Sequence, residues 1–115
     1  MVIKNIYETT VTEEEWNEII NNSEQLVVVD FYADWCMPCL MLTPIIEELA
    51  HKMKDVKFVK INVDENEKLS RKYKILSIPS IIIFKKGKEI DRIIGAQSYD
   101  SIEKKIKSKL DENNS

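Results

Sequence analysis

Two cysteines separated by two residues, Cys36 and Cys39, are the side chains of this sequence best suited by type and spacing to chemistry. They follow an apolar run typical of a buried strand and precede an apolar pattern with helical spacing. Thiols at positions i and i+3 share one face of a helix, so they can form a disulfide with little backbone movement. Unpaired N–H groups at a helix start stabilise a thiolate there, and Cys36 gains most. We therefore expect Cys36 to be the nucleophile and Cys39 the resolving thiol.

Other uses of this cysteine pair fit the sequence less well. A zinc ion needs four ligands, and the other soft candidate, His51, lies roughly three helical turns beyond Cys39. Two reduced thiols that only fill space are a further alternative. Because a C-x-x-C pair at a strand-to-helix junction is typical of redox chemistry, we expect a redox pair and no bound metal.

A carboxylate interrupts the apolar strand that precedes the cysteines. Asp30 lies between Val29 and Phe31, so burial raises its pKa unless it is paired. Alternation along the strand allows the carboxylate to lie beneath the thiols. An aspartate that water reaches at the strand end is the alternative.

The elements that position these residues can be predicted along the chain. We expect strands at residues 2–7, 25–32, 56–63, 80–84 and 89–94. We expect a first helix that begins at a capping box of Thr12 and Glu15 and ends at residues 21–23, and further helices at 36–54, before Tyr73 and after Ser98. Met41 and Met53 are expected in the core, and residues 111–115 are expected to be a frayed end. A strand, a helix and a second strand in succession imply a right-handed parallel crossover. The last two strands form a hairpin in which Gly87 takes a positive φ. The sequence therefore predicts one α/β domain over residues 1–115, with a mixed sheet and helices on both faces.

Three segments carry a resemblance to a known family. Val29 to Cys39 (VDFYADWCMPC) resembles the active-site segment of thioredoxins, and Ser77 to Phe84 (SIPSIIIF) resembles the segment that faces it. Gly95-Ala96 matches a third piece in the expected order, so the resemblance spans nearly the whole chain. It implies a three-layer α/β/α sandwich. Met37 stands where most thioredoxins carry Gly, and Tyr32 where an additional Trp is common, which affects the expected redox poise and partner preference.

The resemblance also implies roles for individual residues. Asp30 would help to deprotonate Cys39, and Lys60 would pair with Asp30, although an ordinary snorkelling lysine fits the sequence nearly as well. Pro79 would be cis and packed against the disulfide. A client polypeptide would dock on an apolar surface around Cys36, with a core Trp35 as the alternative. This surface comprises Trp35, Met37, Pro38, Ile78, Pro79, Gly95 and Ala96, and the Ile78 backbone would pair with the client.

The predicted function is that of a protein-disulfide reductase whose clients are disulfide-containing proteins. Electrons would come from a separate thioredoxin reductase, since a chain with only Gly87 and Gly95 holds no dinucleotide-binding glycine pattern and we expect no bound cofactor. Alternatives are a glutaredoxin-like protein, a disulfide oxidase or isomerase of the same fold, or a binding module whose thiols only regulate affinity.

Composition limits the partners and the location. The 115 residues are 43% apolar and 32% charged with a net charge of −3, which gives no basic patch for nucleic acid. No stretch approaches the roughly 20 apolar residues that span a bilayer. Met1 to Glu8 shows no apolar region or cleavage site of a secretory signal. We therefore expect a cytoplasmic protein. Two cysteines with the spacing of a redox pair are too few for a disulfide scaffold, so we expect a reducing compartment, and we also expect a monomer.

Overall fold

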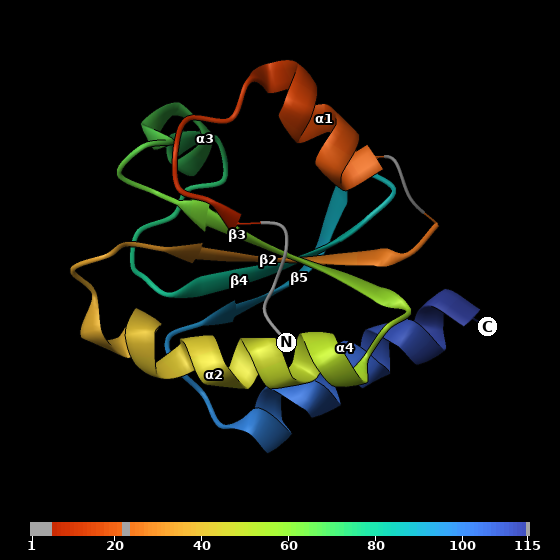
Figure 1. Cartoon of the computed structure of the whole chain (residues 1–115). Helices are drawn as coiled ribbons and strands as arrows, with labels where there is room; N and C mark the ends of the chain where they lie inside the picture. Colours follow the sequence, from red (N-terminus) through yellow and green to blue (C-terminus); the bar gives the residue numbers. More distant parts are fainter. Residues whose placement is uncertain (1–5, 22–23, 115) are drawn as a thin grey trace.

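A central sheet covered by helices on both faces forms the frame of the molecule (Figure 1). The computed structural model describes residues 6–21 and 24–114. The strands are β1 (Ile6–Tyr7), β2 (Leu26–Tyr32), β3 (Val56–Asn62), β4 (Ser80–Lys85) and β5 (Lys88–Ile94). The helices are α1 (Glu13–Asn21), α2 (Met37–Lys52), α3 (Glu67–Lys72) and α4 (Tyr99–Asn114). The predicted α/β sandwich is confirmed.

The sheet has five strands in the order β1-β3-β2-β4-β5. The pairs β1–β3 and β2–β3 are parallel, whereas β4 runs antiparallel to β2 and β5 antiparallel to β4. Every residue of β2 is buried, as expected for a central strand with helices on both sides. Residues 33–35 connect the end of this strand to Cys36, so the most enclosed element of the fold sets the position of the thiols.

Two apolar clusters hold the layers together. On one face of the sheet, α2 and α4 pack against it (Figure 1), around a cluster that includes Val28, Leu42, Ile46, Phe58, Ile81 and Ile102. On the other face lie α1 and α3, around Trp16, Ile20, Val29, Phe31, Ile61 and Phe84. The Trp16 ring meets the Phe84 ring edge-on, at 5.6 Å between centroids and 82° between planes. Alternate residues of β2 therefore serve opposite cores, and Asp30 falls on the α2 side between Val28 and Tyr32.

Local sequence signals account for several element ends. The predicted capping box is confirmed, because the Thr12 N–H donates to Glu15 Oε1 at 2.9 Å and the Glu15 N–H donates to Thr12 Oγ1 at 3.1 Å. The β4–β5 hairpin turns through Lys86 and Gly87, which have φ of 49° and 82°.

The structure differs from the sequence expectations at the C-terminal end of the chain and at one methionine. The first strand is observed over residues 6–7, while residues 2–5 and the helix stop at 22–23 lie outside the described residues. The expected frayed end is wrong for most of its length, because α4 continues to Asn114. Met41 is wrongly assigned to the core, since it is 66% exposed on the outer side of α2. Met53 is buried as expected.

Candidate active site

The two cysteines lie where β2 has ended and α2 begins. Cys36 is the N-cap of α2 with extended backbone (φ −89°, ψ 108°), and it is joined to Cys39 by a disulfide across a Cα–Cα distance of 5.2 Å. The Cys39 N–H donates to Cys36 Sγ at 3.2 Å, and the Leu40 N–H donates to the Cys36 carbonyl oxygen at 3.1 Å. Cys36 Sγ thus occupies the place of a capping oxygen, because it accepts from the Cys39 N–H, which has no partner within the helix.

The segment before β4 covers the disulfide from the side. The Ile78–Pro79 peptide bond is cis, and the Ile78 carbonyl oxygen lies 3.8 Å from Cys36 Sγ. The Gly95 N–H donates to the Pro79 carbonyl oxygen at 2.8 Å, which attaches the end of β5 to the same place. Segments distant in the sequence therefore meet at Cys36, as the resemblance implies.

Apolar side chains surround the disulfide on the protein surface. Trp35 is 71% exposed, which excludes the alternative of a core tryptophan, and Met37 is 65% exposed. Pro38 and Ala96 are exposed, Ile78 and Gly95 are half-buried, and Pro79 is buried. Leu40 and Met41 extend this surface along α2, although sequence reasoning did not place them there. The signal that finds them is their offset from the buried stripe formed by Leu42, Ile46 and Leu49.

Asp30 is fully buried and has an unusual environment. Its residue exposure is 0%, and neither carboxylate oxygen has a hydrogen-bond partner. Burial raises the pKa of the Asp30 carboxyl to about 7, and the nearby charge of Lys60 opposes this rise to a smaller extent. The expectation of a raised pKa holds, and the alternative of an aspartate reached by water does not fit the observed burial.

Lys60 lies beside Asp30, but its ammonium group bonds elsewhere. The Cα atoms of these residues are partners in the β2–β3 register. Lys60 Nζ donates to Thr43 Oγ1 at 3.1 Å and lies 4.4 Å from the centroid of the Tyr32 ring. Lys60 is also buried, with 7% exposure, so it is not an ordinary surface lysine. Sequence reasoning missed Thr43, and its signal is a hydroxyl one helical turn after Cys39.

The described residues outside the disulfide site offer no grouping of metal ligands and no membrane-spanning helix. In residues 6–21 and 24–114, no three His, Cys, Asp or Glu side chains are grouped so that they could hold a metal ion. His51 is exposed on α2. Over the same described residues, no helix combines the length and apolar character needed to cross a membrane.

A mixed sheet that presents a disulfide at a helix start, with a buried carboxylate in the strand leading to it, defines a dithiol–disulfide oxidoreductase. Comparison with known proteins names the family. The family model for thioredoxin matches residues 8–108. The chain belongs to the thioredoxin family, whose members are protein-disulfide reductases.

Individual relatives agree with this assignment. The chain is 47% identical over 95 residues to thioredoxin H2 of Arabidopsis thaliana, across 83% of this chain and 69% of the relative. It is 42% identical over 95 residues to a thioredoxin of Rickettsia bellii, across 82% and 90%. Among solved structures, Fasciola hepatica thioredoxin superposes with a TM-score of 0.81 at 35% identity, covering 90% of this chain and 97% of that one.

Proposed function

We propose that Cys36 is the attacking thiol of this protein-disulfide reductase and that Cys39 resolves the intermediate. The Cys36 thiolate attacks a client disulfide, forms a Cys36–client mixed disulfide and expels one client sulfur, which takes up a proton. The Cys39 thiolate then attacks Cys36 Sγ, forms the Cys36–Cys39 disulfide and releases the second client sulfur. Two electrons pass from the dithiol to the client.

The observation that carries this assignment is the hydrogen bond from the Cys39 N–H to Cys36 Sγ, 3.2 Å long. A backbone donor and the positive end of α2 both favour negative charge on Cys36 Sγ. Cys39 lies within the first turn of the helix and has no comparable donor aimed at its sulfur among the described hydrogen bonds. The two residues hardly differ in exposure, at 4% for Cys36 and 2% for Cys39, so the donor is what distinguishes them. Cys36 is therefore the better thiolate and Cys39 the better second attacker.

Asp30 supplies the base for the second step in this proposal. Its carboxylate faces the α2 side of the sheet, where Tyr32 of the same strand packs with both cysteines. A carboxyl whose pKa is about 7 exchanges a proton readily near neutral pH, which suits removal of the Cys39 proton. Lys60 tunes this base through its charge.

The client docks on the apolar surface around Cys36. The half-buried Ile78 offers its backbone as a short strand partner next to the disulfide, and the exposed rings and side chains of Trp35 and Met37 supply apolar contact. Pro38, Pro79, Gly95 and Ala96 complete the surface. A disulfide-containing segment in extended conformation fits this arrangement.

The remaining features of the proposal come from the family. A thioredoxin reductase returns the disulfide to the dithiol, so the protein acts as an electron carrier without a bound cofactor. We place it in the cytoplasm as a monomer, with residues 1–115 acting as one domain. Its clients are proteins whose disulfides are accessible to Cys36.

The reduction potential of the Cys36–Cys39 couple tests this function by equilibration against glutathione. A value near about −270 mV supports a reductase, whereas a value of roughly −180 to −120 mV indicates an isomerase or oxidase and makes Met37 the first residue to examine. Cys39→Ser should accumulate a mixed disulfide with a client, and Cys36→Ser should not. Full partner function in the double serine variant would instead support a binding module.

A further inference from the structure

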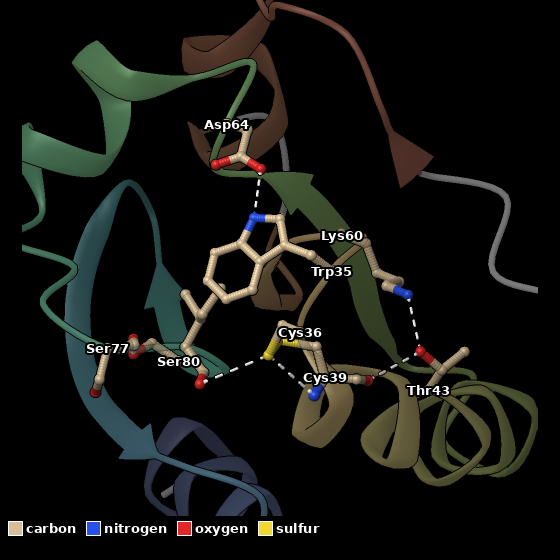
Figure 2. The surroundings of a disulfide bond; sticks show 9 residues. Trp35, Cys36, Cys39, Thr43, Lys60, Asp64, Ser77 and Ser80 are labelled. Atoms are coloured by element: carbon tan, nitrogen blue, oxygen red, sulfur yellow. Dashed lines mark hydrogen bonds between the residues drawn. A yellow bond between two sulfur atoms is a disulfide. The ribbon is translucent and has the colours of Figure 1, made fainter.

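The hydroxyl group of Thr43 connects the buried lysine to the resolving cysteine. Thr43 Oγ1 accepts a hydrogen bond from Lys60 Nζ at 3.1 Å and donates one to the Cys39 carbonyl oxygen at 3.2 Å (Figure 2). Both the donor and the acceptor capacity of this hydroxyl are thus in use. A side chain of α2 therefore fixes the position of an ammonium group that comes from β3.

In that position the Lys60 ammonium group makes no hydrogen bond to the Asp30 carboxylate. Lys60 and Asp30 are register partners in adjacent strands, so their side chains leave the same face of the sheet at neighbouring points. The ammonium group nevertheless bonds to Thr43 and lies over the Tyr32 ring, while both Asp30 oxygens lack a hydrogen bond. Buried opposite charges in adjacent strands normally close on each other, and here a hydroxyl competes for the cation.

We propose that Thr43 is a positioning residue that holds the Lys60 ammonium group off the Asp30 carboxylate and thereby sets the pH range in which Asp30 removes the Cys39 proton. The proposal deepens the function given above and rests on the role assigned there to Asp30. Thr43 itself touches neither the client nor the reacting sulfur atoms in this scheme.

The physical reason is the distance dependence of a charge pair in a buried site. An ammonium group hydrogen-bonded to the carboxylate favours its ionised form and makes it a weaker base. The groups that face Asp30 are Lys60 from β3, Tyr32 on its own strand, Ile81 from β4 and the cysteine end of α2. Lys60 is the charge among them that acts on Asp30, so a change in the position of Lys60 changes the pKa of the Asp30 carboxyl.

The test is a titration of the Asp30 carboxyl carbon by NMR in the oxidised protein. Thr43→Val removes the hydroxyl with little change in shape, and Thr43→Ser retains the hydroxyl. In Thr43→Val the released ammonium group should move to Asp30, and the titration midpoint should fall by about one pH unit or more. Thr43→Ser should titrate as the wild type does, with a midpoint near 7. Thr43→Ala repeats the test if the valine variant does not fold.

A second background shows whether the effect passes through the lysine. In Lys60→Met, which has no ammonium group, Thr43→Val should leave the Asp30 midpoint unchanged. An unchanged midpoint in Thr43→Val alone, an equal fall in Thr43→Ser, or a fall that persists in Lys60→Met would each overturn the proposal. The base role of Asp30 is tested separately by the rate at which Asp30→Asn resolves a trapped mixed disulfide, so the two ideas can fail independently.

Discussion

Trp35 Nε1 donates a hydrogen bond of 2.8 Å to Asp64 Oδ2 (Figure 2), although Trp35 is 71% exposed. The backbone N–H of Asp64 donates to Asn62 Oδ1 at 2.9 Å, which fixes the Asp64 main chain at the end of β3. The bond therefore ties the segment before Cys36 to the end of the neighbouring strand. An aromatic ring next to the disulfide is held in one orientation before any client arrives, which reduces the entropy lost on binding.

Loss of this orientation should weaken client binding. We expect Asp64→Ala to raise KM for a protein disulfide about two- to tenfold with kcat nearly unchanged, because the Trp35 side chain must then be immobilised when the client binds, at about 0.5–1.5 kcal/mol. Steady-state reduction of a protein disulfide measures both constants. Asp34→Ala is the matched control, since it removes a nearby exposed acid that makes none of the described hydrogen bonds to Trp35. Equal KM values in the two variants would contradict the prediction.

The parts of the site that sequence predicts are those fixed by local order. The strand, turn and helix around Cys36 and Cys39 follow from composition and spacing, and the buried carboxylate follows from one polar residue in an apolar strand. The Asp30–Lys60 register could be anticipated from the resemblance alone. The direction of the Lys60 side chain could not, because it depends on a hydroxyl that is 17 residues away in sequence.

The exposed apolar side chains around the disulfide were also harder to predict, because their places depend on contacts that are distant in sequence. Helical spacing identifies a buried stripe on α2, but Met41 is apolar and lies off that stripe, so hydrophobicity alone put it in the core. Likewise, Trp35 bonds to a residue 29 positions later, and no local pattern indicates that partner. Long-range side-chain contacts are decided by packing, which periodicity does not describe.

Gly95 permits a direct test of the backbone beside Pro79. It has φ of +83°, and a Cβ built there meets nothing within 4 Å. Gly95→Ala should therefore lower the free energy of unfolding by roughly 1–2 kcal/mol through backbone conformation alone, and Gly95→Asn should cost less. Gly87→Ala, at φ of +82°, should cost a similar amount, because the exposed Asn21 side chain that its Cβ would contact can move aside. Urea unfolding gives the ranking, and an alanine variant at Gly95 as stable as the wild type would contradict it.

The capping box at the start of α1 provides a prediction about stability far from the disulfide. Thr12→Ala removes the acceptor of the Glu15 N–H and should lower the free energy of unfolding by about 1 kcal/mol, while the rate of disulfide reduction stays the same. Glu18→Ala, an exposed substitution later in the same helix, should change stability by less than about 0.5 kcal/mol. Equal effects of the two substitutions in urea unfolding would argue against a capping role for Thr12.

Asp30 should make the protein less stable as pH rises. The pKa of its carboxyl is about 7 in the folded protein against 3.8 as the ordinary value. Below about pH 4 the group is protonated in both the folded and unfolded states and has no linked effect. Between about pH 4 and 7 unfolding releases a proton, so the free energy of unfolding falls, and above pH 7 the full loss of about 4 kcal/mol remains.

Asp30→Asn isolates this effect because an amide does not titrate. Any cost of the amide in the core is the same at each pH, so the stability of the variant relative to the wild type should increase by about 4 kcal/mol between pH 4 and pH 8. Urea unfolding of the oxidised proteins at several pH values measures it, since the disulfide keeps both cysteines from titrating. Asp111→Asn, an exposed change on α4, should follow the wild-type curve. Parallel curves for wild type and Asp30→Asn would show that the buried carboxyl titrates alike in both states.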